Sequence, residues 1–139
     1  MRSYEAASDI QAPPEKVWAA LIDGSSYTSW DSGVEKFEGT IAPGSTIKVY
    51  SEVAPGRAFP AKVVEYEPNR KMTWESGMPL GLFKGRRAFN LTPNGDGTRF
   101  QMREEFTGPL LPIIGRSIPD LQPAFDKFAR GLKARVEAG

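Results

Sequence analysis

Two strand-like runs flank the turn Asn94-Gly95-Asp96-Gly97, and their alternation constrains the fold more than any other feature of the chain. If these four residues form a hairpin loop, Pro93 faces Thr98 and Arg87 stands opposite Glu104. The face that carries this Arg–Glu pair is otherwise apolar and consists of Phe83, Phe89, Leu91, Phe100, Met102 and Phe106. The opposite face carries mainly polar and charged side chains. A shift of one residue would invert both faces, so the pattern itself predicts this register.

Composition removes several classes of function. The chain has 139 residues, of which 40% are hydrophobic and 25% charged, and we expect a single domain over residues 1–139. A net charge of +1 gives no general attraction to nucleic acid. Because the chain has no cysteine and no histidine, thiol catalysis and Ser-His-Asp catalysis are excluded and a zinc site is disfavoured. We expect no metal and no cofactor.

Nothing in the sequence predicts a targeting or membrane-spanning segment. The N-terminal residues lack the apolar core of a signal peptide, and no run approaches about 18 apolar residues. We therefore expect a cytoplasmic protein. We also expect a monomer or a weak homodimer, with no nucleic-acid partner.

Turn signals divide the chain into an ordered series of elements. A first strand is expected over residues 3–10, then a helix that begins near Pro13-Pro14 and stops at Asp23-Gly24, then a short second helix or a turn over 25–32. Six strands follow, at 34–39, 45–53, 57–66, 70–77, 83–93 and 98–107. Their close spacing leaves no room for crossover helices, so the sheet is predicted to be an antiparallel meander.

A long terminal helix closes the chain. Asp120 is the predicted N-cap, which places Pro123 in the first turn, where it breaks no hydrogen bond. The apolar stripe of the helix consists of Leu121, Phe125, Phe128, Leu132 and Val136. The fold class is therefore α+β: one strand, two short helices, six strands and a long helix.

Several motifs in this order support a family resemblance. They are Ile10-Gln-Ala-Pro-Pro-Glu-Lys-Val-Trp18, Asp23, Tyr27 and Trp30, the Gly39–Gly44 turn, Val64-Glu-Tyr-Glu-Pro68, Thr73-Trp74 and Phe89-Asn-Leu-Thr-Pro-Asn-Gly-Asp-Gly-Thr98. The chain resembles the START/birch-pollen-allergen (SRPBCC) superfamily, in its polyketide cyclase/dehydrase and lipid-transport-like branch. The motifs cover almost the whole chain. They are specific for fold rather than activity, because most of them mark packing and turns.

The resemblance implies a helix-grip fold, in which a curved antiparallel sheet of about seven strands wraps round the terminal helix and encloses an apolar cavity. Relatives in the superfamily include ligand carriers, aromatase/cyclases, ubiquinone-binding proteins and activators of a heat-shock ATPase. Likeness of fold does not choose among these functions.

Apolar side chains gather on the loops at one end of the predicted sheet. In a meander, successive turns alternate between the two ends, so loops 54–56, 77–82 and 108–115 meet at one end. These loops carry Met78, Leu80, Leu82, Leu110, Leu111, Ile113 and Ile114. They predict a cavity mouth or a contact surface, and the alternative is that they fold back and plug the cavity. Membrane contact is not favoured, because no basic cluster accompanies them.

The predicted ligand-binding residues come from the strands, these loops and the helix stripe. They are Trp30, Val49, Phe59, Trp74, Met78, Leu82, Arg87, Phe89, Met102, Glu104, Phe106, Leu121, Phe125 and Phe128. For each apolar member, ordinary core packing is the alternative. Tyr27 and Asp31 are further polar candidates, and anchoring the short helix is the role favoured for them.

Arg87 and Glu104 have two interpretations. Arg87 lies four residues, or about 13 Å, from the mouth end of its strand, which is cavity depth. The pair is either a self-satisfied salt bridge, or a site where the guanidinium keeps donors free for a ligand carboxylate, phenolate or carbonyl while Glu104 holds it in place.

The leading functional hypothesis is binding, and by extension transport, of a small hydrophobic molecule such as a lipid, a polyketide or an aromatic compound. The enzyme alternative is a polyketide aromatase/cyclase or dehydratase, with Arg87 and Glu104 as the catalytic residues. A glutamate held by an arginine is expected to stay ionised and to be a poor proton donor, so the residues favour a binding protein over an enzyme. A third class is a protein-interaction module of the heat-shock ATPase activator type that acts through loops 77–82 and 108–115.

Overall fold

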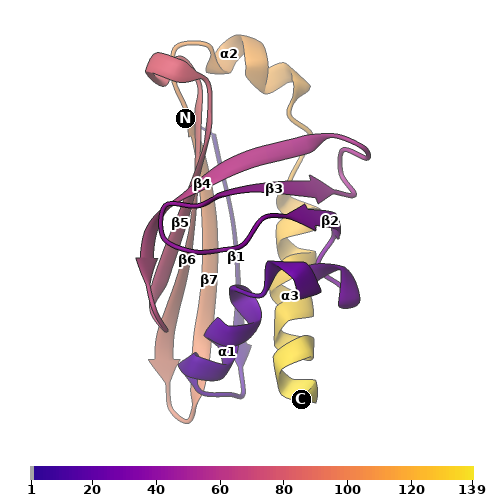
Figure 1. Ribbon diagram of the computed structural model, residues 1–139, viewed down its shortest axis with the longest axis vertical. Coiled ribbons are helices and arrows are strands. Elements are labelled where there is room, and N and C mark those ends of the chain that lie inside the picture. Colours follow the sequence, from indigo (N-terminus) through magenta and orange to yellow (C-terminus); the bar gives the residue numbers. More distant parts are fainter. Residues whose placement is uncertain (1) are drawn as a thin grey trace.

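One antiparallel sheet curls along a long C-terminal helix in the computed structural model, which describes residues 2–139 (Figure 1). The elements are β1 (Arg2–Ile10), α1 (Pro14–Leu21), the 3₁₀ helix η1 (Gly24–Ser29), β2 (Val34–Glu38), β3 (Thr46–Ser51), β4 (Ala58–Glu67), β5 (Lys71–Gly77), η2 (Pro79–Gly81), β6 (Lys84–Asn94), β7 (Gly97–Thr107), α2 (Leu111–Ile114), η3 (Gly115–Ser117) and α3 (Gln122–Ala138). The strand order is β1-β7-β6-β5-β4-β3-β2. This arrangement confirms the predicted α+β helix-grip class. Figure 1 shows β2 and β3 crossing α3 at a steep angle.

The hairpin β6–β7 has the predicted register. Arg87 pairs with Glu104, and the neighbouring pairs are Phe89 with Met102, Leu91 with Phe100 and Pro93 with Thr98. The turn is tighter than the four-residue loop expected, because Asn94 pairs with Gly97. Gly95 adopts a φ of 61°, a conformation that glycine reaches without the steric penalty of a side chain.

Strand β1 joins the sheet beside β7, the most distant strand in the sequence. Ile10 pairs with Thr98 and Tyr4 pairs with Glu104. The hydroxyl of Thr98 donates to the carbonyl oxygen of Ala12 at 2.7 Å and so ties the start of the α1 segment to β7. The meander therefore runs from β2 to β7, and β1 forms the outer edge next to β7.

The terminal helix begins later than the sequence predicts. It starts at Gln122, with Leu121 at the N-cap position instead of Asp120. The Asp120 carboxylate still accepts a hydrogen bond from the backbone N–H of Gln122, at 3.1 Å, so it stabilises the helix start from one residue further out. Phe125, Phe128, Leu132 and Val136 of the predicted stripe are buried, whereas Leu121 is half-buried.

A close backbone approach seats the η1–β2 connection on α3. A Cβ atom at Gly131 would overlap the carbonyl oxygen of Asp31, so only glycine fits there. Beside this contact, the ring of Phe128 lies 5.5 Å from that of Tyr27 and 5.2 Å from that of Trp30. This aromatic cluster packs α3 against η1 and the residue that follows it. No helix within residues 2–139 has both the length and the apolar character needed to cross a membrane.

Candidate functional site

A cavity of about 520 Å³ lies between the sheet and α3. Known small-molecule sites occupy roughly 300–1,000 Å³, so the size suits a compact ligand. Strands β3 to β7 supply the largest share of the wall, and α3 and the segment that precedes it supply a second share. The rest comes from η1, residues 32–34, the loop between β3 and β4, and Phe83. The wall is mostly apolar, because alternation along each strand directs one set of side chains inward.

Most of the predicted ligand-binding residues surround this cavity. Those that line it are Val49, Phe59, Trp74, Arg87, Phe89, Met102, Glu104, Phe106, Leu121, Phe125 and Phe128. Their role in binding a ligand remains a prediction. Trp30, Met78 and Leu82 do not line the cavity. Trp30 packs on Tyr27 and Phe128 and borders a different pocket, whereas Met78 and Leu82 are 43% and 37% exposed around η2.

Sequence reasoning missed several wall residues from the last part of the chain. Ile118, Pro119 and Ala124 line the cavity. The path of the chain before α3 depends on tertiary packing, and no local pattern predicts it. Ala124 could have been found, because it lies three residues after Leu121 and thus on the same side of the helix.

Arg87 and Glu104 place an ion pair in the wall. Arg87 Nη2 donates to Glu104 Oε1 at 2.8 Å. The Glu104 side chain is 8% exposed and that of Arg87 is 26% exposed. The guanidinium carbon of Arg87 also lies 4.9 Å from the ring centroid of Phe125, a distance at which cation–π attraction operates. Arg87 therefore contacts strand β7 through Glu104 and helix α3 through Phe125.

The ion pair belongs to a row that crosses four neighbouring strands. Tyr4 on β1 pairs with Glu104, Glu104 with Arg87, and Arg87 with Trp74 on β5. Residues directly opposite on antiparallel strands share a face of the sheet, so all four side chains belong to the inner face. The ring of Trp74 packs edge to face on Phe89, with 4.8 Å between the centroids.

Two nitrogen atoms in this row are buried without an acceptor. They are Nε1 of Trp74 and Nε of Arg87, and neither has a hydrogen-bond partner within residues 2–139. Leaving a buried donor unpaired costs about 1–3 kcal/mol, so such atoms are uncommon in folded proteins. Both side chains line the cavity, which makes this row its most unusual polar feature.

Tyr27 anchors the short helix and also lines the cavity, whereas Asp31 contacts α3 instead of capping the short helix. The buried hydroxyl of Tyr27 donates to the carbonyl oxygen of Leu21. Burial raises the pKa of Tyr27, and the positive charge of Arg87 opposes this only in part, so the phenol is neutral. Asp31 accepts an ion-pair contact from Lys127 of α3 at 3.2 Å and is not part of the cavity wall. Residues 2–139 contain no cluster of three or more potential metal ligands.

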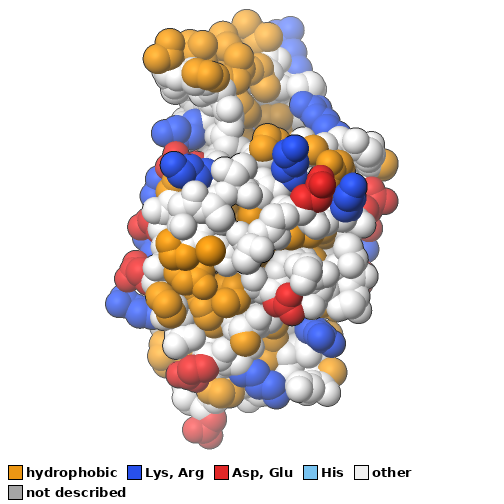
Figure 2. All heavy atoms as spheres, viewed as in Figure 1, with side chains coloured by type: hydrophobic (Ala, Val, Ile, Leu, Met, Phe, Trp, Pro, Cys, Tyr) orange, Lys and Arg blue, Asp and Glu red, His pale blue; other side chains and the backbone are white. Residues whose placement is uncertain are grey.

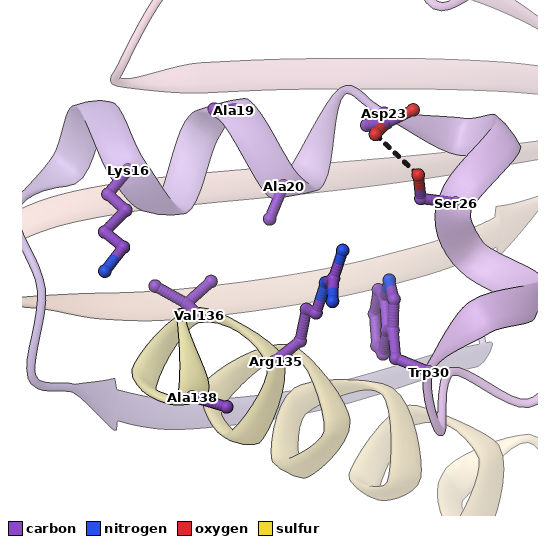
Figure 3. A pocket seen from close by; sticks show the side chains of 10 residues that line it. Lys16, Ala19, Ala20, Asp23, Ser26, Trp30, Arg135, Val136 and Ala138 are labelled. Carbon is purple, nitrogen blue, oxygen red and sulfur yellow. Dashed lines mark hydrogen bonds between the residues drawn. The ribbon is translucent and has the colours of Figure 1, made fainter.

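A second pocket of about 310 Å³ lies between α1, η1 and the end of α3 (Figure 3). Figure 3 shows Lys16 at one end and Trp30 and Ser26 at the other, with Val136 and Arg135 between them. Asp23 in its wall accepts hydrogen bonds from Ser26 at 2.6 Å and Ser25 at 3.0 Å, and the bond from Ser26 is the main reason why the pKa of Asp23 is lowered. This pocket is smaller and contains no unpaired buried donor among the described residues, so the larger cavity is the candidate site.

The apolar loops at the predicted mouth divide between the cavity and the surface. Ile114 lines the cavity, whereas Ile113 is 66% and Leu80 is 96% exposed. Figure 2 shows one group of apolar side chains at the end of the molecule that carries α2 and η2, and a second group lower on the same face. These loops therefore border the cavity and also expose apolar surface.

Comparison with known proteins identifies the family and the fold. Residues 1–137 match the family described as polyketide cyclase / dehydrase and lipid transport. No curated protein matches the chain. Similar solved structures include protein MLL2253 from Mesorhizobium loti, at 19% identity with a TM-score of 0.75, over 99% of this chain and 98% of that one. TTHA0849 from Thermus thermophilus is 23% identical with a TM-score of 0.73, over 99% and 98%.

A norcoclaurine synthase point mutant from Thalictrum, solved in complex with a transition-state analogue, is 15% identical with a TM-score of 0.71, over 99% of this chain and 94% of that one. At these identities the likeness extends to the fold alone. The shared fold nevertheless spans nearly the full length of each protein.

Proposed function

This chain belongs to the polyketide cyclase / dehydrase and lipid transport family, and from that premise we propose that its cavity binds a small hydrophobic molecule. The membership agrees with the resemblance seen in the sequence. The single observation that carries the proposal is the cavity of about 520 Å³, walled by aromatic and aliphatic side chains with one ion pair among them. Removing apolar ligand surface from water is the main source of binding energy in such a site.

An apolar dye tests the proposal directly. Nile red is expected to bind the folded protein with one site and to be displaced by small apolar molecules. Ala61 on β4 lines the cavity, so Ala61→Phe should fill part of it and weaken dye binding. Ala19→Phe makes the same change in the second pocket and is expected to leave binding unchanged. Equal dye binding by both variants and the unaltered protein would count against the cavity as the site.

Native mass spectrometry provides an independent test. Protein purified without denaturation is expected to carry an additional small mass that is lost on mild activation. The same bound mass should be depleted in Ala61→Phe and retained in Ala19→Phe. A bound mass retained equally in both variants would place it outside the cavity.

A second candidate function is catalysis as an aromatase/cyclase or dehydratase. The observation in its favour is the guanidinium of Arg87 in the cavity wall, because a cation there would polarise a substrate carbonyl. Two groups that could move protons are already engaged, since Glu104 accepts from Arg87 and Tyr27 donates to Leu21. Turnover of a model poly-β-ketone that is retained in Arg87→Lys and lost in Arg87→Gln would establish this activity. No turnover by the unaltered protein would exclude it for that substrate.

A further inference from the structure

The two unpaired donors of the cavity wall lie on neighbouring strands. Trp74 and Arg87 are directly opposite each other on β5 and β6, and both belong to the inner face. Trp74 is 5% exposed, yet its indole N–H has no acceptor among the described residues, and the same holds for Nε of Arg87. The Cβ atoms of directly opposed residues on antiparallel strands lie about 5 Å apart, so both donors belong to one region of the wall. Glu104 accepts from Nη2 of Arg87, but neither of these two nitrogen atoms has an acceptor among the described residues.

The charge of the same region is already balanced. The positive charge of Arg87 is matched by Glu104, whose carboxylate lies 2.8 Å from Nη2. Tyr27 contributes no charge, since burial raises its pKa and it remains protonated. Arg57 is the other charged residue of the wall, but it is exposed and its guanidinium carbon lies 5.5 Å from the ring of Phe59. Solvent screens its charge, so the buried end of the cavity is close to neutral.

A neutral region with surplus donors favours one kind of ligand group. A carbonyl or hydroxyl oxygen would accept from these donors without adding charge. A carboxylate would also accept, but it would bring a second negative charge beside Glu104 into a region where burial of an unbalanced charge is unfavourable. The combination of unpaired donors and balanced charge therefore favours binding of an uncharged acceptor over binding of an anionic one.

We propose that the ligand carries an uncharged oxygen acceptor, a carbonyl or hydroxyl group, that binds at the Trp74–Arg87 part of the wall, and that the site discriminates against the matching carboxylate. This inference rests on the proposed function and specifies its ligand class. The apolar body of the ligand occupies the aromatic wall, and its oxygen lies at the sheet side of the cavity. Glu104 sets the selectivity by neutralising Arg87.

Three naphthalenes of similar size test the proposal through displacement of Nile red. They are 2-ethylnaphthalene, which has no acceptor, 2-acetylnaphthalene, which has a carbonyl, and 2-naphthoate, which is an anion at pH 7. We expect 2-acetylnaphthalene to bind about tenfold more tightly than 2-ethylnaphthalene, because its carbonyl oxygen accepts hydrogen bonds from donors that are otherwise unpaired. We expect 2-naphthoate to bind at least about tenfold more weakly than 2-acetylnaphthalene.

Matched variants assign the discrimination to particular residues. Trp74→Phe should reduce the advantage of the acetyl over the ethyl compound several-fold, while Trp18→Phe, a buried tryptophan outside the cavity, should leave it unchanged. Glu104→Gln should strengthen 2-naphthoate binding about tenfold, because Arg87 then keeps an unbalanced charge. The thermal midpoint of each variant, measured by circular dichroism, establishes that it is folded.

The outcomes separate the inference from the proposed function. Equal affinities for the ethyl and acetyl compounds would overturn the inference and leave apolar binding intact. Tighter binding of 2-naphthoate than of 2-acetylnaphthalene would also overturn it, and loss of that binding in Arg57→Gln would place the anion at the mouth. Failure of all three compounds to displace the dye would count against the proposed function as well.

Discussion

Arg87 and Glu104 are paired across β6 and β7, and their side chains are bonded at 2.8 Å but unequally exposed, at 26% and 8%. The carboxylate is the buried partner, and the guanidinium reaches the cavity. Removing Arg87 therefore leaves a buried carboxylate without its partner, whereas removing Glu104 leaves a guanidinium that is still exposed to the cavity. This asymmetry has a measurable consequence for stability.

Arg87→Met is expected to lower the free energy of unfolding by about 3 kcal/mol, because it leaves a buried carboxylate without its partner. Glu104→Met should cost less, about 1–2 kcal/mol, since the remaining guanidinium has access to the cavity. The double variant should be close to the unaltered protein. Urea unfolding of all four proteins measures the three values, and a double variant as unstable as Arg87→Met would contradict the account.

Gly131 on α3 provides a second test. Replacing glycine by alanine inside a helix ordinarily stabilises it by about 0.5–1 kcal/mol. At this position a Cβ atom would overlap the carbonyl oxygen of Asp31, so Gly131→Ala should instead destabilise the protein by about 2 kcal/mol or more. Ala134→Gly, at an exposed position of the same helix, should cost only about 1 kcal/mol. A stabilising Gly131→Ala would show that the helix and the η1–β2 connection are less closely packed than described.

The buried phenol of Tyr27 is expected to make the free energy of unfolding fall at alkaline pH. Burial raises its pKa above the ordinary value of 10.0, so above about pH 10 the folded protein keeps a proton that the unfolded chain releases. The free energy of unfolding should then fall by about 1.4 kcal/mol per pH unit from this group. This stability is fully present below about pH 10 and is lost as the pH rises.

Tyr27→Phe removes the titrating group together with its hydrogen bond to Leu21. The variant should be about 1 kcal/mol less stable than the unaltered protein at pH 7, and the difference should vanish or reverse near about pH 11. Urea unfolding across this pH range measures the difference. A difference that stays constant with pH would mean that Tyr27 ionises equally in both states.

Leu80 supports a prediction about the apolar end of the molecule. Its φ is 63° and its side chain is 96% exposed, so it adopts a left-handed conformation without gaining burial. Leu80→Gly is expected to raise the free energy of unfolding by about 0.5 kcal/mol. Leu82 is nearby with a right-handed φ of −60°, and Leu82→Gly should lower stability. Thermal unfolding compares the two, and equal destabilisation by both would contradict the argument.

Local patterns in the sequence determined the register of the β6–β7 hairpin and the side chains on its inner face. The two-residue period of residues 83–107 predicted the register, the inward face and the opposition of Arg87 and Glu104, and the structure confirms all three. These features follow from a turn and its adjoining strands, so they depend on neighbours that the sequence itself places together. The motifs of the resemblance predicted the helix-grip class for the same reason, because they mark turns and packing positions.

Tertiary structure alone decided which of these side chains meet around the cavity and which stay unpaired. The pairing of β1 with β7, the separation of Ile114 from the exposed Ile113, and the absence of an acceptor for the indole N–H of Trp74 within the described chain are all of this kind. Each depends on segments far apart in the sequence. A hydrogen-bond partner or a wall position exists only once those segments have packed, so no period or local motif encodes it.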